Sequence, residues 1–421
     1  MNKVLILGGA NQHVKLVEAA HRLGYYAIVA DYLTDSPAKI IADKSFLIDI
    51  KDIDSLERIC REERIDGVVS GFLDPCQMPY ALLCDRLHLP CFGTVDQFYK
   101  LTNKVAFKRM CEQYGVGIIK TYTEDDITID FDDYPLFIKP TDSRGSRGQT
   151  VCRKYEDVSS AIALAKAESS DGECIIEKYL GDCDEVQITI FMVDGVPHLE
   201  RTVDSYRGSV ELSLEKVVNC SISPSKHTAE FISNSYPQIV NMIKGLGIKN
   251  GPVFMQGFTK QGKFYFFDPG LRFPGVEYER IFQSVFNVSL EEWLVYYSVN
   301  GCFPDTEQFP QKAYDLNGKK GVVLFPVLLP GTVKEIHGEE VFRSLPTTIS
   351  FTTRYGVGDQ VPAVYNVNQR YAEIDMLADD IKGIKNLIIK FQQDVIIIDN
   401  QGKRMLFDAF DITRLASGYE N

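Results

Sequence analysis

A lysine at the end of an apolar segment, followed at once by a loop rich in glycine, serine and arginine, is the clearest chemical signal in this sequence. Residues 134–138 are mainly apolar, Lys139 and a proline come next, and the chain from Thr141 to Gly148 reads Thr-Asp-Ser-Arg-Gly-Ser-Arg-Gly. Glycine lets backbone N–H groups approach an anion closely, and the two arginines add positive charge. The pattern predicts a strand and a loop that cradle phosphate, with a solvated surface hairpin as the alternative. A second apolar strand runs into Glu-Lys-Tyr-Leu at residues 177–180.

Oxygen-bearing side chains further along the chain suit a hard cation. Gln256 and Asp268 lie on two apolar segments that flank a tight turn at residues 260–263, which predicts two paired strands. Carboxylate and amide oxygens are ligands that Mg²⁺ accepts, and such an ion can bridge phosphate oxygens. Arg272 follows four residues after Asp268, so a buried Asp268 satisfied by Arg272 alone is the alternative.

The first hundred residues supply elements of another kind. Four apolar segments alternate with amphipathic helices, which predicts a doubly wound parallel sheet. The expected strands are at residues 4–7, 26–30, 46–50 and 67–70. Asp31 lies about 20 residues beyond the Gly8-Gly9 turn, where a dinucleotide-binding protein has its ribose-binding acid. The glycines do not follow the Gly-x-Gly-x-x-Gly spacing, however, so a nicotinamide cofactor is disfavoured.

The composition changes again after residue 305. Residues 314–421 read as short strands separated by glycine turns, with one helix expected from Met376 to about Ile389. This pattern predicts a compact α+β segment.

Composition excludes several classes of protein. The 421 residues carry 45 Lys and Arg against 58 Asp and Glu, a net charge of −13, which disfavours a nucleic-acid binder or a protein of anionic membranes. An apolar fraction of 45% can build buried cores, and no apolar run approaches the roughly 20 residues of a membrane-spanning helix. Ten cysteines without a Cys-x-x-Cys pair and six dispersed histidines predict reduced thiols in the cytoplasm, without a disulfide framework or a zinc site.

Taken together and in this order, the motifs resemble those of the ATP-grasp superfamily, in the branch of carbamoyl phosphate synthetase, biotin carboxylase and the L-amino acid ligases. The resemblance covers nearly the whole chain and implies three parts. A Rossmann-like pre-ATP-grasp domain would span residues 1–98. A two-part ATP-grasp domain would span residues 99–310, with its lid subdomain at about 115–182. A small biotin-carboxylase-like α+β piece would span residues 311–421.

The resemblance assigns ATP to named residues. Lys104 and Lys139 would contact its phosphates, with Lys139 also near the adenine, and the glycine-rich loop would close on the triphosphate. The backbone of Lys178 and Leu180 would bind the adenine edge, and Glu185 would hold the ribose. The full implied set of nucleotide-binding residues is Lys104, Lys139, Ser143, Gly145, Ser146, Gly148, Glu177, Lys178, Tyr179, Leu180 and Glu185.

A metal site follows from the same resemblance, with one departure from the family pattern. Mg²⁺, as one or two ions, would bind Gln256 and Asp268. The family usually has Glu-x-Asn-x-Arg, and this chain reads Asp268-Pro-Gly270-Leu-Arg272 at that place. Because Gly270 has no side chain, a backbone carbonyl or water would have to replace the asparagine ligand, and a second ion lacks one of its expected ligands.

The implied reaction is a ligation. A carboxylate attacks the γ-phosphate of ATP, and an amine then displaces phosphate from the acyl phosphate. Arg272 and Lys139 would be the catalytic residues, and Gly275 would lie beside the acceptor. Arg207 and Arg354, each next to a glycine turn, are candidate partners for a carboxylate of the acceptor, although an ordinary surface arginine explains each at least as well.

Two classes of function follow from this reading. The first is an ATP-dependent carboxylate–amine ligase that acts on a small carboxylic acid or amino acid and releases ADP and phosphate. The second is a catalytically degenerate ATP- or ADP-binding protein with a regulatory or assembly role, and Gly270 is its main support. The resemblance also implies small-molecule carboxylate and amine partners, and a homodimer formed through the first or the last domain.

Overall fold

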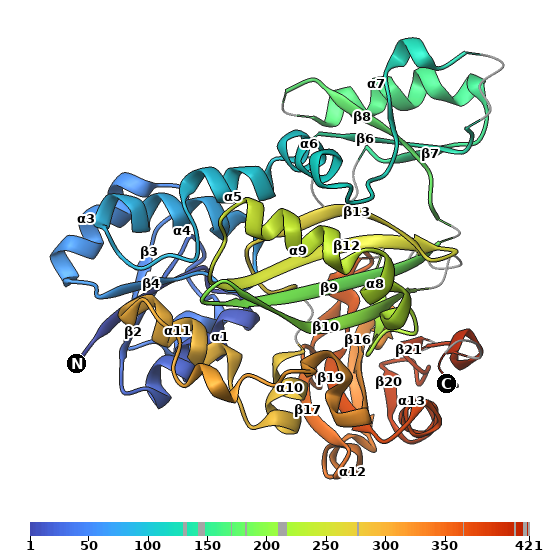
Figure 1. The fold of residues 1–421 in the computed structure, drawn as a ribbon. Helices are drawn as coiled ribbons and strands as arrows, with labels where there is room; N and C mark the ends of the chain where they lie inside the picture. The colour runs from blue at the N-terminus through green and yellow to red at the C-terminus, as the bar shows by residue number, and fades with distance from the viewer. Residues whose placement is uncertain are drawn as a thin grey trace.

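The computed structural model describes residues 1–128, 133–141, 148–169, 171–181, 183–208, 217–275, 278–364, 366–407, 410–415 and 419. Their elements form a parallel-sheet domain, a small lid, a long antiparallel sheet and a C-terminal lobe (Figure 1). The expected combination of α/β and α+β architecture is confirmed. Within these ranges, no helix has both the length and the apolar character needed to cross a membrane.

The first region is the doubly wound parallel sheet that the sequence predicts. Its strand order is β3-β2-β1-β4, and residues 4–7 of its central strand are fully buried between the helices. Strand β3 ends earlier than the predicted residues 46–50, because the Asp49 side chain accepts the Lys51 N–H at 2.9 Å in a turn. The elements are β1 (Lys3–Leu7), α1 (Asn11–Arg22), β2 (Tyr26–Asp31), α2 (Pro37–Ile41), β3 (Lys44–Leu47), α3 (Ile53–Glu63), β4 (Gly67–Val69) and α4 (Asp74–Leu87).

Two helices lead from this domain to the lid, which has a sheet and a core of its own. The sheet order is β5-β8-β6-β7, and α7 packs on it around Leu136, Ile138 and Ile176. In Figure 1 the lid lies beyond α6, apart from the long central sheet. The elements are α5 (Val95–Thr102), α6 (Lys104–Tyr114), β5 (Thr121–Tyr122), β6 (Leu136–Pro140), β7 (Thr150–Cys152), α7 (Val158–Glu168) and β8 (Cys174–Lys178).

The long sheet has eight strands in the order β13-β12-β9-β10-β11-β14-β19-β17. It does not stop at residue 310, where the third part was expected to begin, because β11 pairs with β14 and the sheet continues through β19 to β17. The division at residue 310 therefore stays a prediction about folding units, and one sheet runs across it. The strands are β9 (Asp184–Val193), β10 (Val196–Arg207), β11 (Val218–Ser223), β12 (Gly251–Lys260), β13 (Lys263–Gly270), β14 (Lys320–Leu324), β17 (Thr348–Thr353) and β19 (Ala372–Ala378).

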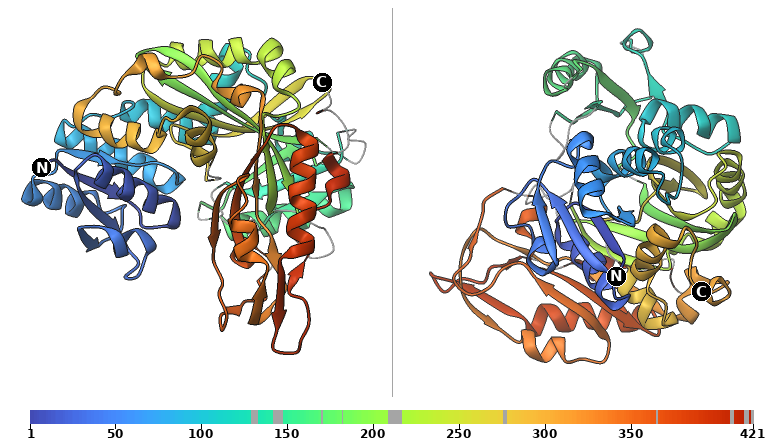
Figure 2. Two further views of the ribbon diagram at one scale, coloured as in Figure 1. Left: turned by 90° about the horizontal axis from the view of Figure 1, so that it is seen from below. Right: turned by 90° about the vertical axis from the view of Figure 1, so that its left-hand side faces the viewer.

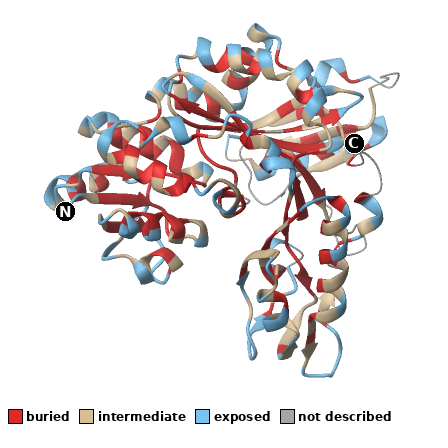
Figure 3. Cartoon of the chain, turned by 60° about the horizontal axis from the view of Figure 1, so that its bottom comes forward, coloured by how far each residue is buried: buried red, intermediate tan, exposed pale blue. Residues whose placement is uncertain are grey.

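Aromatic side chains join this sheet to the first domain. Phe191 on β9 has the rings of Phe273, Phe303 and Phe309 within 5.1–5.9 Å of its own centroid. Helix α11 carries Trp293 into the same group and packs on α1 and β4. Figure 3 shows that both sheets consist largely of buried residues. The helices beside the long sheet are α8 (Thr228–Asn234), α9 (Tyr236–Gly245), α10 (Glu279–Phe286) and α11 (Leu290–Asn300).

The C-terminal lobe corrects one expectation. The helix predicted from Met376 begins instead at Ile381, because residues 372–378 alternate with Ile374 and Met376 buried in the sheet, and Asp380 then caps the helix by accepting the Gly383 N–H at 2.7 Å. Figure 2 shows the lobe projecting from the long sheet. Its remaining elements are β15 (Val327–Leu328), β16 (Gly331–His337), α12 (Glu339–Arg343), β18 (Gln360–Val361), α13 (Ile381–Asp394), β20 (Ile396–Asp399) and β21 (Leu406–Phe407).

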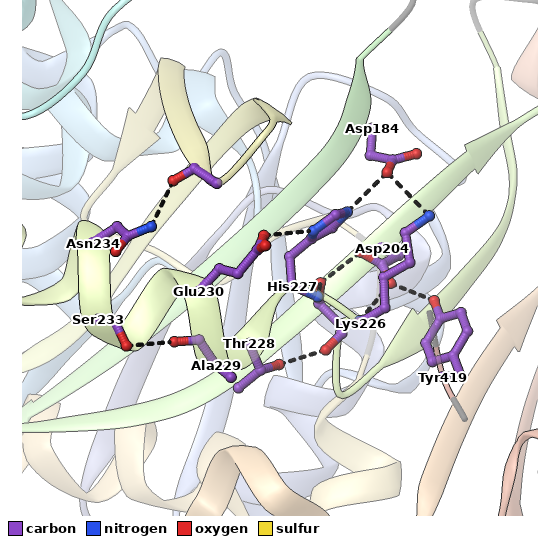
Figure 4. A network of polar contacts seen from close by, with 12 residues as sticks. Asp184, Asp204, Lys226, His227, Thr228, Ala229, Glu230, Ser233, Asn234 and Tyr419 are labelled. Carbon is purple, nitrogen blue, oxygen red and sulfur yellow. Dashed lines mark hydrogen bonds and ion pairs between the residues drawn. The ribbon is translucent and has the colours of Figure 1, made fainter. Parts of the chain in front are cut away.

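A polar network fixes the start of α8 to the long sheet (Figure 4). His227 Nε2 lies 2.8 Å and Lys226 Nζ 3.0 Å from Asp184 Oδ2, and the buried Asp204 accepts the Lys226 N–H at 2.8 Å. The Tyr419 hydroxyl also donates to Asp204, so the network ties Tyr419 to the sheet.

We expect this network to make stability depend on pH through Asp184 and His227. The hydrogen bond from His227, helped by Lys226, lowers the pKa of Asp184 to about 2, so its stabilising effect is lost as pH falls from about 4 toward 2. Burial opposes ionisation of His227, but Asp184 and Asp204 outweigh it and raise the His227 pKa, so that contribution is lost as pH rises through the raised value.

His227→Gln is therefore expected to lower the free energy of unfolding by about 1 kcal/mol near pH 6, a modest value because Asp184 is 46% exposed. Urea unfolding should show this difference shrinking above about pH 8, where histidine is neutral. A difference that stays constant across this range would contradict the charge-based explanation.

Candidate active site

Two lysines converge on one buried carboxylate inside the lid. Strand β6 carries Lys139, the neighbouring strand β8 carries Glu177, and α6 carries Lys108. Lys139 Nζ and Lys108 Nζ each lie 2.6 Å from a different oxygen of Glu177, whose side chain is 3% exposed. Burial alone would raise the Glu177 pKa, but the two ammonium groups together lower it. Because the group of three keeps one net positive charge, it favours a further anion nearby.

Lys108 was not predicted from the sequence, although its spacing from Lys104 could have indicated it. Lys104 and Lys108 are four residues apart on a helix, so both fall on one face. Lys104 is exposed, and its Nζ donates to the Thr141 carbonyl at 3.2 Å, which places it where the glycine-rich loop leaves β6. The structure therefore brings three lysines to the lid's entrance.

Of the predicted loop residues, only Gly148 lies within the described part of the chain; Ser143, Gly145 and Ser146 lie outside it. Gly148 has a φ of +67°, and a Cβ there would lie 2.8 Å from Pro140 Cγ and 2.9 Å from Glu168 Cβ. Glycine is therefore required by the close packing of the loop end against the lid, whatever the loop binds.

We expect Gly148→Ala to lower the free energy of unfolding of the protein by about 2 kcal/mol, since it adds both a strained φ and a steric clash. Gly172 is a matched control, because its φ is +72° but a Cβ there would have open space around it. Gly172→Ala should cost only about 1 kcal/mol in chemical denaturation. Equal losses for the two variants would show that the packing around residue 148 yields easily.

The expected adenine-binding segment begins at the end of β8. The Lys178 N–H donates to the Lys120 carbonyl at 3.0 Å, and the Tyr179 N–H donates to the Pro135 carbonyl at 2.9 Å. The Leu180 carbonyl accepts the Cys183 N–H at 3.0 Å. An adenine at this edge would therefore use the Lys178 carbonyl and the Leu180 N–H, and the roles of Lys178, Tyr179 and Leu180 stay predictions.

Glu185 is held by two partners on the long sheet. Gln256 Nε2 donates to Glu185 Oε1 at 2.5 Å, and Arg207 Nε donates to Glu185 Oε2 at 2.5 Å. The structure thus places Arg207 beside the expected ribose ligand, away from Arg354, with which the sequence reasoning had grouped it. Since the Gln256 amide nitrogen faces Glu185, the Gln256 oxygen is left for another partner.

Gln256 and Asp268 are direct register partners on β12 and β13, as the predicted hairpin requires. Asp268 is 41% exposed and lies 3.9 Å from Arg272 Nη2. Burial raises the Asp268 pKa, and the nearby Asp74 carboxylate raises it further, while Arg272 opposes both. Two neighbouring carboxylates that repel each other are a favourable place for a cation.

The first domain contributes residues that the sequence reasoning did not find. Arg272 Nε lies 2.5 Å from Asp74 Oδ1, and Gln77 Oε1 accepts the Leu271 N–H at 2.8 Å. A Cβ on Gly270 would lie 3.1 Å from both polar atoms of Gln77. Because α4 reaches this site only through the fold, about 200 residues of sequence separation hid Asp74 and Gln77 from motif analysis.

The donor set fits ATP with Mg²⁺. Lys104, Lys108 and Lys139 offer positive charge toward phosphates, and the half-exposed Asp268 carboxylate with the Gln256 amide oxygen offers the hard ligands that Mg²⁺ takes. Arg272 is 5% exposed and its guanidinium lies 4.8 Å over the Phe254 ring. Packing on this ring therefore holds the guanidinium in place.

The other predicted residues are scattered. Gly275 is exposed, and its carbonyl accepts from Gln12 Nε2 at 3.4 Å. Arg354 is exposed at the end of β17 and donates to the Val367 carbonyl at 3.2 Å. Asp31 lies where a dinucleotide-binding protein would have its ribose-binding acid. Here it accepts the Gly9 and Leu33 N–H groups at 2.9 and 2.8 Å and so stabilises the local backbone. All ten cysteines are free thiols.

Part of this chain is similar in sequence to known proteins. Residues 103–197 match the family described as carbamoyl-phosphate synthase L chain, ATP binding domain, and this range contains Lys104, Lys139 and Glu185. A curated relative, the formate-dependent phosphoribosylglycinamide formyltransferase of Methanocaldococcus jannaschii, is 26% identical over 207 residues, which are 47% of this chain and 53% of the relative. The chain thus spans about half the length of that relative.

Solved structures share the fold over almost the whole chain. Phosphoribosylglycinamide synthetase from Anaerococcus prevotii superposes with a TM-score of 0.77 at 17% identity and covers 95% of this chain and 100% of its own. The biotin carboxylase domain of a Hydrogenobacter thermophilus 2-oxoglutarate carboxylase, solved as a dimer with MgADP and bicarbonate, gives 0.73 at 16% identity and covers 94% and 91%. The family resemblance inferred from the motifs is confirmed.

Proposed function

We propose that this chain, an ATP-grasp protein, is an ATP-dependent ligase that activates a small carboxylate as its acyl phosphate and joins it to an amine. The observation that carries the proposal is the pairing of two half-sites. The lid offers a net positive group around Glu177, and the long sheet offers Asp268 and Gln256 side by side. Both half-sites suit one ligand, a nucleoside triphosphate with its divalent cation.

In this proposal the chain's own residues position charge and exclude water. Lys104 and Lys139 would hold the phosphates, Glu185 would take the ribose hydroxyls, and Asp268 with Gln256 would hold Mg²⁺. When bound there, the ion would supply positive charge next to the transferred phosphoryl group. Arg272, fixed by Asp74 and by the Phe273 carbonyl at 2.8 Å, presents its remaining nitrogen toward the reacting oxygens.

The same proposal explains why a glycine at residue 270 can replace the asparagine of the family pattern. The Gln77 amide occupies the space that a side chain at residue 270 would need, at 3.1 Å from the position of its Cβ. We infer that Gln77 and Asp74 supply, from the first domain, polar groups that the missing asparagine would have offered. In this proposal the polar groups come from the first domain instead of from residue 270, and the protein keeps its catalytic turnover.

The remaining expectations accompany this proposal. A ligase of small metabolites with ten free thiols suits the reducing cytoplasm, and we place the protein there. Its partners would be a carboxylate, an amine and a second copy of the chain.

The experiment is phosphate release from ATP and Mg²⁺ with small carboxylic acids, amino acids and amines supplied singly and in pairs. The proposal expects release only with one acid and one amine together, and ADP as the nucleotide product. ATP binding without release for any pair would overturn it and favour the regulatory or assembly protein.

A further inference from the structure

A cavity of about 500 Å³ lies where the first domain meets the long sheet. Its lining comes from the end of α4, the segment that joins α4 to α5, the segment before β12, and α11. Two cysteines of the first domain, Cys84 and Cys91, are among the residues that line it. Of the described residues proposed to hold ATP or Mg²⁺, none lines this cavity, so it needs an explanation of its own.

The backbone brings Cys84 and Cys91 side by side. A left-handed residue reverses the chain directly after α4, which packs against α5 (Figure 1). The Leu89 N–H then donates to the Cys84 carbonyl at 3.0 Å, and the Phe92 N–H donates to the Tyr80 hydroxyl at 3.3 Å. Tyr80 and Cys84 are four residues apart on α4 and share one face. Because Cys91 lies between the two anchored residues, the returning chain places it alongside Cys84.

Hydrogen bonds around the Cys91 sulfur stabilise its thiolate. The Cys84 thiol donates to it, and the Gly93 N–H and the Tyr80 hydroxyl donate as well. These donors lower the pKa of Cys91, although burial opposes them. Cys91 is half-buried and lines the cavity, so solvent can reach it. A partly exposed thiolate is the reactive form of cysteine.

Cys84 has the opposite surroundings. Its side chain is 1% exposed and belongs to the last turn of α4, where the helix dipole disfavours a negative charge. Burial raises the pKa of Cys84, so it stays a protonated thiol beside the thiolate. Burial also raises the pKa of Cys60, Cys76 and Cys111 to about 12, which leaves those thiols unreactive.

We propose that Cys91 and Cys84 are a redox-active pair that reduces a hydroperoxide and closes to a reversible disulfide. The Cys91 thiolate attacks one peroxide oxygen, the O–O bond breaks, and the other oxygen leaves with a proton from solvent as water or an alcohol. The Cys84 thiol then attacks the sulfur of the Cys91 sulfenic acid. The S–S bond forms, and the sulfenic hydroxyl leaves with the Cys84 proton as water. The two thiols lose two electrons, and the peroxide gains them.

The cavity distinguishes this pair from cysteines that only fill a core. A hydroperoxide is small enough to enter it, and both cysteines line it. The Tyr297 hydroxyl donates to the Cys91 carbonyl at 3.3 Å, which holds the reactive residue at the cavity wall. The pair does not depend on the proposed ligase, because it uses no residue of the ATP site and its test needs no turnover.

The test is peptide mapping of the oxidised protein. The reduced wild-type protein is treated with one equivalent of hydrogen peroxide, the remaining thiols are alkylated, and the peptides are identified by mass spectrometry. We expect a disulfide between Cys84 and Cys91, the loss of these two thiols from the ten, and full reversal by dithiothreitol. No disulfide, or a disulfide between another pair such as Cys91 and Cys302, would overturn the proposal.

Three variants separate the roles of the two cysteines, and thermal unfolding checks that each one folds. Cys91→Ala should react with peroxide at least about tenfold more slowly than the wild type. Cys84→Ala should form no disulfide but leave a Cys91 sulfenic acid that dimedone traps. Cys302→Ser removes an exposed thiol and should react like the wild type. A Cys91→Ala variant that reacts as fast as the wild type, or Cys84→Ala without a trapped sulfenic acid, would contradict the assignment.

Discussion

Replacing Lys139 with alanine is expected to weaken ATP binding by roughly ten- to a hundredfold while the protein stays folded. A hydrogen bond to a charged group contributes about 1.5–3 kcal/mol, and each tenfold in affinity corresponds to about 1.4 kcal/mol. The fold should survive because Lys108 still pairs with the buried Glu177 at 2.6 Å. Titration calorimetry with MgATP measures the loss, and thermal unfolding monitors the fold.

Lys120 on the same lid provides the control for this variant. Its ion pair with Asp133 is exposed, with 67% of the lysine side chain in solvent. Lys120→Ala should bind MgATP like the wild type. If Lys139→Ala also binds ATP like the wild type, the lid group is not the phosphate site and the placement of the nucleotide is wrong.

Replacing Arg272 with lysine is expected to slow phosphate release by about 10²–10³-fold with little change in ATP affinity. Arg272 uses its Nε for Asp74 and Nη1 for the Phe273 carbonyl, which aims Nη2 toward Asp268. A lysine keeps the charge but cannot reproduce this fork, and loss of one fixed donor to a transition state has effects of this size. Steady-state rates and MgATP binding, measured together, separate the two effects.

Asp74→Asn distinguishes charge stabilisation from mere support of the site. The asparagine oxygen can still accept from Arg272 Nε, so the guanidinium should keep its place and the rate should fall by less than about tenfold. A loss as large as that of Arg272→Lys would mean that the site needs the negative charge of Asp74 and not only an oxygen that accepts a hydrogen bond. An Arg272→Lys variant with unchanged turnover would remove Arg272 from the reacting end.

Most of the architecture could be predicted from short-range patterns in the sequence. The parallel sheet of the first domain followed from apolar segments that alternate with amphipathic helices, and the structure forms it in the order β3-β2-β1-β4. The hairpin that pairs Gln256 with Asp268 followed from a turn between two apolar runs. The helix expected from Met376 was wrong because an apolar run in a buried strand looks like a helix face until the sheet is known.

Motif analysis could not predict the site residues that are distant in the sequence and meet only in the folded chain. Asp74 and Gln77 lie nearly 200 residues from Arg272 and Leu271, and only the folded chain brings α4 beside the segment that follows β13. Arg207 looked like a substrate ligand, yet its partner Glu185 is set by a register between β9 and β10 that no local pattern encodes.

The fate of the carboxylate oxygen shows whether the acid is activated as an acyl phosphate. The acid that supports phosphate release would be labelled with ¹⁸O in its carboxylate, turned over with its amine and ATP, and the released phosphate examined by mass spectrometry. When the amine attacks an acyl phosphate, one labelled oxygen leaves with the phosphate, so we expect one ¹⁸O atom in each phosphate released. Unlabelled phosphate, or AMP as the nucleotide product, would contradict activation of the carboxylate at the γ-phosphate.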